Sequence, residues 1–381
     1  MGYNQRVGGK HKIEIKKGCV MGTLQKLFVG MILVGAVAGC GLTDSAAPAP
    51  TATATRVPVT ATSLPSTATP TSTTPTATSP AATATRIALP TITGTQAPIA
   101  RLVSVGKYSL YLSCTGSGFP TVVMDSGLGA GSSEWSFIAP KIAANTAGSL
   151  PPVGTRVCVY DRANTGRSDK ASTPRTSQDL VDDLHTLLSN AGVAGPYVLV
   201  GHSLGGLNAR LFASEYPESV VSMVLVDAAH EDLWNRLLSL IPAASADEPP
   251  EFKAYRGSLN AAQGNERIDL KVSGEQVRAL RKAALRQAQG TPIGQTQGAG
   301  AQFGAMPLIV LSHGKPIAGI PPLYATIVES IWSDMQLDLL SLSTNSKQII
   351  ATQSGHDIPS DQPQLVIDAA REVVRVLRAG G

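Results

Sequence analysis

The stretch from Tyr197 to Pro217, YVLVGHSLGGLNARLFASEYP, changes character at its centre. It opens with apolar, β-prone residues, passes through the glycine-rich GHSLG of 201–205, and continues with the apolar spacing of a helix. A serine between glycines at such a point is the G-x-S-x-G pattern, in which a sharp turn lifts the serine hydroxyl above the sheet edge. The stretch therefore predicts an α/β fold that presents Ser203 as a nucleophile.

Short β-rich runs alternate with helical segments from about residue 100 onward, which is typical of an α/β fold on a largely parallel sheet. Clear helices are expected at 177–192 and 363–381, where apolar residues recur with helical spacing. The predicted strands are RLVSVG from 101, YSLYLSC from 108, TVVMDSG from 121, RVCVYD from 156, YVLVGHS from 197, SMVLVDA from 222, PLIVLSH from 307 and KQIIATQ from 347.

The segment from Ala228 to about Met306 breaks this alternation, because it holds helical pieces and no clear strand. A structureless loop of that length is uncommon in a compact domain, so we predict a helical lid inserted at about 228–306. Ser273, three residues before Gln276, fits a capping box that opens one of its helices. The basic side chains of that helix are expected to form a solvated face: Arg278, Arg281, Lys282 and Arg286.

Residues 1–39 have the pattern of a signal peptide, with basic residues ahead of the apolar LFVGMILVGAVAG of 27–39. This apolar stretch is shorter than the roughly 20 residues of a spanning helix, which disfavours a retained anchor. The residues VAGC of 37–40 resemble the lipobox of bacterial lipoproteins, whose cysteine receives a diacylglyceryl group. The resemblance implies an extracytoplasmic protein held at the cell membrane by a lipid on Cys40. An ordinary signal peptide is the alternative, and translation starts at either Met1 or Met21.

Residues 40–98 are almost entirely Thr, Ala, Pro and Ser. Such a composition buries too little apolar surface to offset its ordering entropy, so we predict a disordered stalk that precedes a globular domain at 99–381. The formal net charge is +4, but the basic excess lies in the first 39 residues. The rest of the chain is close to neutral, so no nucleic-acid partner is implied.

Two of the four cysteines, Cys114 and Cys158, fall on predicted strands of the globular domain. In an exported domain this arrangement favours a disulfide between them. Two buried free thiols are the alternative.

The serine turn and two further segments resemble the α/β-hydrolase superfamily over nearly all of residues 100–378. TVVMDSGLGAGSSEW from 121 looks like the family's strand and oxyanion loop, and VYDRANTGRSD from 159 looks like its YDRxGxGxSD segment, with Asn164 replacing the first glycine. The resemblance implies an α/β-hydrolase fold with a mostly parallel eight-stranded sheet flanked by helices. It also places the second and fourth strands side by side, which supports the disulfide between Cys114 and Cys158.

A serine hydroxyl needs a base within hydrogen-bond reach and a carboxylate that orients the base. His356 follows the last strand and precedes the last helix, where the family carries its base, so we assign it that role. The other histidines are expected to lie in the signal region, within a helix, at the variable position of the serine turn, or at strand ends with structural or pocket-lining roles: His11, His185, His202, His230 and His313.

Many members of the superfamily carry the acid after the seventh strand, but there this sequence has Lys315 and Pro316. Other members carry it at the end of the sixth strand, so the resemblance implies Asp227 as the acid. The alternatives for the acid are Asp334, Glu231 and Asp232.

The backbone N–H groups of Leu128 and Leu204 are predicted to form the oxyanion hole. These assignments predict a serine hydrolase that cleaves small-molecule carboxylic esters through an acyl-enzyme. Amide, thioester or carbon–carbon bond hydrolysis, acyl transfer and a noncatalytic surface-binding module remain alternatives. A serine at the turn disfavours haloalkane dehalogenase and epoxide hydrolase chemistry, since those relatives carry aspartate there. No zinc-ligand spacing and no phosphate-binding glycine loop is found, so no metal or cofactor is expected.

Overall fold

A computed structural model describes residues 96–144, 154–240, 244–290 and 301–380. The predicted signal peptide, Cys40 and all but the last residues of the predicted stalk lie outside these ranges. Among the described residues, no helix combines the length and the apolar character that a membrane span requires.

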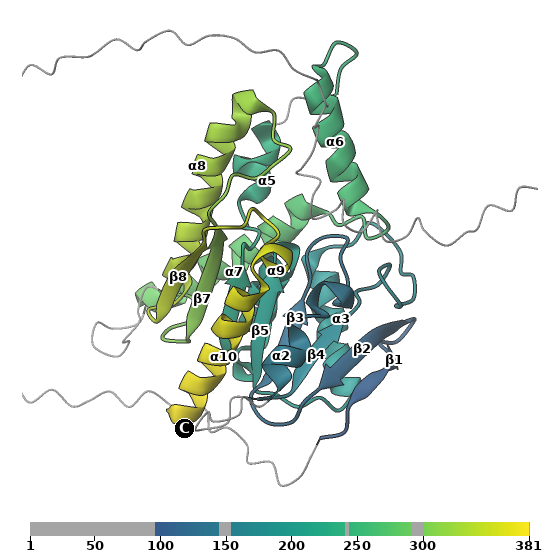
Figure 1. The fold of residues 1–381 in the computed structure, drawn as a ribbon, viewed down its shortest axis with the longest axis vertical. Helices are drawn as coiled ribbons and strands as arrows, with labels where there is room; N and C mark the ends of the chain where they lie inside the picture. Colours follow the sequence, from purple (N-terminus) through teal and green to yellow (C-terminus); the bar gives the residue numbers. More distant parts are fainter. Residues whose placement is uncertain (1–95, 145–153, 241–243, 291–300, 381) are drawn as a thin grey trace, which may run out of the picture. The chain divides into compact units, whose positions relative to one another are not determined.

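An eight-stranded sheet has the order β1-β2-β4-β3-β5-β6-β7-β8 (Figure 1). Strand β2 is antiparallel to both its neighbours, and all other adjacent pairs are parallel. All eight predicted strands are present, and the mostly parallel sheet is confirmed. The strands are β1 (Ile99–Ser104), β2 (Ser109–Thr115), β3 (Thr121–Asp125), β4 (Val157–Tyr160), β5 (Tyr197–His202), β6 (Val220–Val226), β7 (Leu308–His313) and β8 (Ser346–Ala351).

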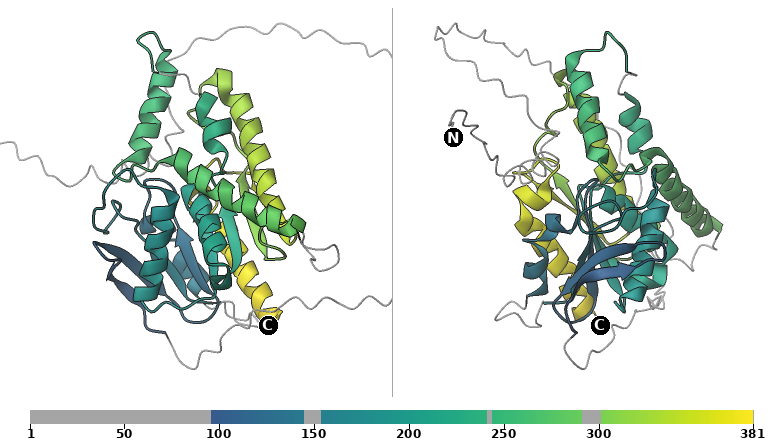
Figure 2. Two further views of the ribbon diagram at one scale, coloured as in Figure 1. Left: turned by 180° about the vertical axis from the view of Figure 1, so that it is seen from behind. Right: turned by 90° about the vertical axis from the view of Figure 1, so that its right-hand side faces the viewer.

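Helices cover both faces of the sheet (Figure 2). One face carries α2 (Ala139–Ala143), α9 (Ile358–Asp361) and α10 (Pro363–Ala379), and the other carries α3 (Ser177–Asn190), α4 (Leu204–Glu215) and α7 (Leu270–Gly290). Successive side chains of a strand point to opposite faces, so Leu199 joins one apolar core while Val198 and Val200 join the other. Both faces of the central strands are therefore buried, which explains their unbroken apolar runs.

The segment predicted as a lid contains α5 (Leu233–Arg236), α6 (Pro250–Gln263) and α7, and it precedes α8 (Pro322–Leu339). Helices α5 and α6 and the first half of α8 extend past the main body of the sheet, whereas α7 packs against α3 and α4 (Figures 1 and 2). Short 3-10 turns complete the described elements: η1 (Ser132–Trp135), η2 (Pro217–Ser219), η3 (Leu238–Leu240) and η4 (Leu340–Leu342).

One sequence prediction about α7 is wrong, and another is correct only in part, since Lys282 and Arg286 are exposed. The helix begins at Leu270, and Ser273 lies buried within it, where its hydroxyl accepts the N–H of Ser177 at the start of α3. Ser273 therefore serves a neighbouring helix and does not cap its own. The basic face is also only partly solvated, because Arg278 and Arg281 form ion pairs with acidic residues around β6 and α8.

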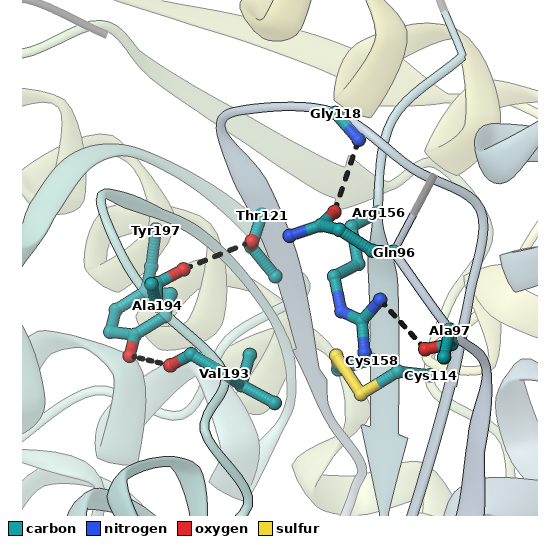
Figure 3. The surroundings of a disulfide bond; sticks show 10 residues. All are labelled: Gln96, Ala97, Cys114, Gly118, Thr121, Arg156, Cys158, Val193, Ala194 and Tyr197. Atoms are coloured by element: carbon teal, nitrogen blue, oxygen red, sulfur yellow. Dashed lines mark hydrogen bonds between the residues drawn. A yellow bond between two sulfur atoms is a disulfide. The ribbon is translucent and has the colours of Figure 1, made fainter. Parts of the chain in front are cut away.

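The disulfide between Cys114 and Cys158 is present and joins β2 to β4 at directly paired positions (Figure 3). Beside it, the guanidinium of Arg156 donates to the carbonyl of Ala97 at 3.1 Å. The bridge thus fixes the only antiparallel strand of the described sheet to the parallel strands.

Candidate active site

The turn between β5 and α4 holds Ser203 in a backbone conformation that non-glycine residues rarely adopt, with φ +50° and ψ −116°. The Ser203 N–H donates to the carbonyl of Val226 at 3.1 Å, which ties the turn to β6. Neighbouring positions have no room for a side chain, since a Cβ on Gly201 would overlap the backbone of Gly205 and one on Gly205 would overlap the carbonyl of Asp125. The glycines of the motif are therefore required for close packing of strand, turn and helix.

The structure brings Ser203, His356 and Asp227 together, although they are far apart in the sequence. His356 Nε2 lies 3.0 Å from Ser203 Oγ, and His356 Nδ1 lies 2.6 Å from Asp227 Oδ2. An ionised carboxylate only accepts hydrogen bonds, so the proton of a neutral His356 sits on Nδ1 and the lone pair of Nε2 faces the hydroxyl. This is the arrangement that a general base for serine requires.

The Asp227 carboxylate is inaccessible to solvent, and each of its two oxygens accepts two N–H groups. Oδ1 accepts the backbone N–H of His313 at 3.2 Å and Trp332 Nε1–H at 3.1 Å, and Oδ2 accepts the ring N–H groups of His313 and His356. Burial alone raises the pKa of Asp227, but the hydrogen bonds from the two histidines outweigh it and hold the pKa below the ordinary value. Asp227 is therefore a fixed carboxylate.

None of the other three acidic candidates contacts His356 in the described part of the chain. Asp334 is an exposed residue of α8 that pairs with Arg236 at 3.3 Å. The two carboxylates that follow β6 are each paired with an arginine of a helix: Glu231 with Arg210 of α4 and Asp232 with Arg278 of α7.

His313, at the end of β7, lies between two carboxylates. Its Nδ1 is 2.9 Å from Asp227 Oδ2, and its Nε2 is 3.0 Å from Glu329 Oε2. Burial alone lowers the pKa of His313, but hydrogen bonds and charge from the two carboxylates raise it to about 9. The sequence identified His313 only as a structural or pocket-lining residue, and the sharing of Asp227 was not predicted.

His202, the variable residue of the serine turn, connects the two loops that flank the site. Its Nδ1 lies 2.5 Å from Glu134 Oε1, and its Nε2 lies 2.9 Å from the backbone carbonyl of His356. The other oxygen of Glu134 accepts the N–H of Gly127 at 3.0 Å. Burial lowers the pKa of His202, but the charge and hydrogen bond of Glu134 raise it to about 9. Burial likewise raises the pKa of Glu134, but the charge and hydrogen bond of His202 hold that pKa below its ordinary value. The sequence analysis missed this pair; the one local signal was the glutamate of SSEW beside the expected oxyanion loop.

The loop after β3 places Leu128 between two amides that are already engaged by carboxylates. The N–H of Gly127 donates to Glu134, and the N–H of Gly129 donates to Glu266 at 2.5 Å. Within the described residues, the N–H of Leu128 and that of Leu204, the first residue of α4, have no protein acceptor. These two groups are free to donate to a ligand.

Buried Arg162 holds this loop in place. Its guanidinium donates to the carbonyls of Ser126 at 2.7 Å and Gly127 at 2.6 Å, and it pairs with Asp125 and Glu266, each at 2.6 Å. Burial alone lowers the pKa of Arg162, but the charges of the two carboxylates outweigh it and hold the pKa well above the ordinary value. Glu266 lies between α6 and α7, so the inserted segment contacts the loop after β3 both directly, at the N–H of Gly129, and through this arginine.

A cluster of His230, Glu231 and Asp338 offers three ligand atoms close together. Their carboxylates already accept hydrogen bonds from arginines, Glu231 from Arg210 and both acids from Arg281. The three possible metal ligands are therefore already engaged in an ion-pair network, and this arrangement does not fit a resident metal ion.

Residues 120–288 match the family described as alpha/beta hydrolase fold. The chain is 27% identical over 251 residues to the uncharacterized protein YqjL of Bacillus subtilis, which covers 66% of this chain and 82% of YqjL. It is 31% identical over 141 residues to a 2-hydroxy-6-oxononadienedioate/2-hydroxy-6-oxononatrienedioate hydrolase of Paraburkholderia phymatum, 36% of this chain and 47% of that enzyme. A solved thermophilic esterase from Thermogutta terrifontis is similar with a TM-score of 0.47 and 18% identity, over 74% of this chain and 99% of the esterase.

The family match and the sheet order together show the α/β-hydrolase fold and support a place among the hydrolases of that superfamily. The chain spans less than half of the Paraburkholderia enzyme, so the similarity concerns the shared segment.

Proposed function

We propose that this chain of α/β-hydrolase fold is a serine hydrolase that cleaves carboxylic esters through an acyl-enzyme. The observation that carries the proposal is the line of contacts from the Ser203 hydroxyl, through the imidazole of His356, to the buried carboxylate of Asp227. A serine hydroxyl is a weak nucleophile at neutral pH and needs such a neighbour to remove its proton.

In this proposal Ser203 Oγ attacks the ester carbonyl while His356 Nε2 takes the hydroxyl proton. The tetrahedral intermediate collapses to an acyl-enzyme when the resulting imidazolium protonates the departing alcohol. His356 then activates a water that releases the acid and restores the serine. Asp227 accepts the Nδ1–H of His356 throughout, which keeps Nε2 directed at the serine and stabilises the imidazolium.

We propose that the oxyanion accepts hydrogen bonds from the N–H groups of Leu204 and Leu128. Support comes from the position of Leu204 at the N-terminus of a 12-residue helix and from the fixed loop around Leu128. Loss of one such donor typically costs about 3 kcal/mol of transition-state stabilisation.

The substrate class is a small-molecule ester, and the helices α5, α6 and α8 are proposed to act as its lid. Apolar residues that adjoin α5 or lie on α8, including Leu237, Val328 and Met335, form one cluster with Trp332. The Trp332 ring meets the His356 ring edge-on at a centroid distance of 5.2 Å. An acyl group bound beside His356 would therefore meet an apolar surface.

The test is labelling by a fluorophosphonate probe, together with hydrolysis of short p-nitrophenyl esters. We expect the wild-type chain to react with both and the Ser203→Ala variant with neither. The Asp334→Asn variant is the matched control, because it removes an exposed carboxylate of α8 and should retain full activity. Undiminished ester hydrolysis by Ser203→Ala would refute the assignment.

A panel of matched esters, amides and thioesters distinguishes ester hydrolysis from the other acyl chemistries, since all of them use a triad and an oxyanion hole. We expect the highest kcat/KM on an ester. A preference for an amide or thioester would keep the mechanism but replace the proposed substrate class.

We further propose an extracytoplasmic location with a lipid on Cys40, supported by the sequence VAGC at the end of the apolar segment. Metabolic labelling with a palmitate analogue should mark the wild-type chain in a bacterial membrane fraction and leave Cys40→Ala unlabelled. Equal labelling of both would contradict the proposal.

A further inference from the structure

The triad carboxylate serves two imidazoles, and only one of them is explained by the proposed mechanism. His356 and His313 donate to the same oxygen of Asp227, at 2.6 and 2.9 Å. The ring of His313 has no part in proton transfer to or from the serine. Its far nitrogen contacts Glu329, on α8.

We propose that His313, as an imidazolium held between Asp227 and Glu329, is a positioning residue that fixes the triad carboxylate for His356. The inference rests on the proposed serine hydrolase function and adds to it a residue that acts through Asp227.

The charge of His313 follows from its acceptors. Each ring nitrogen faces a carboxylate oxygen, and a carboxylate cannot donate, so both nitrogens carry a proton. A neutral imidazole would turn a lone pair toward Asp227 or toward Glu329 at about the same distance. Either tautomer replaces an attractive contact by a repulsive one.

The partners of His313 are themselves fixed. Glu329 Oε1 accepts the backbone N–H of Ile317 at 2.6 Å, which ties α8 to the loop after β7. Trp332, one turn further along α8, donates to the other oxygen of Asp227. Helix α8 therefore orients the triad acid twice, once directly through Trp332 and once through Glu329 and His313.

Removal of the cation would leave two carboxylates facing each other at the base of the site. The side chain of Asp227 is fully buried and that of Glu329 is 28% exposed. Among the described residues, the ionisable groups that contact the His313 ring are these two acids, and His356 shares Asp227 Oδ2. With His313 uncharged, repulsion between the acids would move the Asp227 carboxylate away from the position that His356 needs.

This arrangement predicts an alkaline limb in the pH dependence of kcat/KM. Charge and hydrogen bonds of the two acids raise the pKa of His313 to about 9, against the effect of burial, so activity should fall as pH rises through that value. His202 titrates in the same range, so the limb alone does not identify His313.

The test measures kcat/KM on a p-nitrophenyl ester from pH 5 to 10 for the full chain and four variants: Glu329→Gln, His313→Asn, the double variant of these two, and Asp334→Asn. Glu329→Gln removes one of the two acids, so its alkaline limb should move to lower pH by about one unit or more. In a His313→Asn background the same change should cause no shift, because no histidine remains there to titrate. Asp334→Asn, on the same helix, is the control and should leave the profile unchanged.

His313→Asn itself retains an amide N–H for Asp227 but loses the charge and Glu329. We expect kcat to fall about 10- to 100-fold, as for a misplaced catalytic group, with KM within about twofold of wild type. Equal profiles for wild type and Glu329→Gln, or an unchanged kcat in His313→Asn, would overturn the proposal.

A second measurement needs no turnover. In the ¹⁵N-histidine-labelled chain, His313, assigned by its loss in His313→Asn, should show two ring N–H signals at pH 7 and lose one as pH rises through about 9. A single ring N–H at pH 7 would overturn the proposal. If the serine hydrolase assignment failed instead, the wild-type chain would neither react with the fluorophosphonate probe nor hydrolyse p-nitrophenyl esters. The two ring N–H signals of His313 would still be present at pH 7.

Discussion

The substitution Asp227→Asn tests how the triad acid works, because it changes one oxygen into an amide nitrogen at nearly constant shape. Oδ1 of Asp227 accepts the backbone N–H of His313 and the indole N–H of Trp332, neither of which can become an acceptor. The asparagine must therefore keep its oxygen there and turn its NH₂ toward the histidines. His356 Nδ1 then has to accept, which moves its proton to Nε2, facing the hydroxyl of Ser203.

A triad histidine with its proton on Nε2 cannot take the serine proton. In serine proteases this change of tautomer lowers kcat by about 10⁴-fold, which corresponds to about 5.5 kcal/mol of transition-state stabilisation. We expect a loss of that size here, since Asp227 is fully buried and no water can replace the missing acceptor.

The assay is kcat for short p-nitrophenyl esters at pH 7.5, with the rate of fluorophosphonate labelling measured in parallel. Asp334→Asn is the matched control, because this other acid candidate pairs with Arg236 at the surface and should keep wild-type activity. Retention of more than a tenth of wild-type kcat by Asp227→Asn would refute the tautomer argument. A loss confined to Asp334→Asn would move the role of the acid to that residue.

Three further predictions concern stability. Gly205→Ala places a Cβ against the backbone carbonyl of Asp125, so the free energy of unfolding in urea should fall by about 1–3 kcal/mol or more. Replacing Cys114 and Cys158 by serine opens a loop with a sequence separation of 44, and chain entropy predicts a loss of roughly 4 kcal/mol in the same assay. The pKa of His202 is raised to about 9 in the folded chain, against about 6.5 in the unfolded chain. The stability that this residue contributes is therefore complete below about pH 6.5 and is lost as pH rises through about 9. Urea titrations between about pH 6 and 10 should show a loss on the order of 3 kcal/mol in the free energy of unfolding.

The sheet was predictable from the sequence because its central strands are buried on both faces. The run VVSMVLV of β6 is almost entirely apolar and lacks the alternation of polar and apolar residues that a half-exposed strand shows. Glycine or aspartate follows the apolar residues of the central strands and marks where they end. The serine turn was also predictable, because the close packing around it requires glycine at positions 201 and 205. These two glycines lie close together in the sequence and form the G-x-S-x-G pattern. Asp227 and His356 were assigned because members of the superfamily that the sequence resembles carry an acid and a base after the corresponding strands.

The connections around the triad could not be read in the same way, because they join residues that are distant in the chain and ordinary in type. Arg162 and Glu266 are 104 positions apart, and a glutamate in a polar, inserted segment is expected at the surface. The prediction that Ser273 caps its own helix was wrong for a related reason. Its hydroxyl accepts the N–H of Ser177, a contact between two helices that the local sequence pattern does not indicate. Local propensity predicts elements, but not which buried polar groups pair across them.

The three histidines of the site differ in what their ring nitrogens face, and this difference explains which of them can act as a base. His202 faces a carboxylate and a backbone carbonyl, and His313 faces two carboxylates, so all four of these nitrogens must donate. His356 faces one carboxylate and the hydroxyl of Ser203, the only one of these partners that can itself donate. A neutral imidazole is therefore satisfied at His356 alone. Burial does not produce this choice, because the side chain of His202 is 4% exposed and that of His356 is 18% exposed, and burial would favour a neutral ring at His202. The partners around each ring, and not its depth, therefore leave only Nε2 of His356 facing a group that can donate a proton to it.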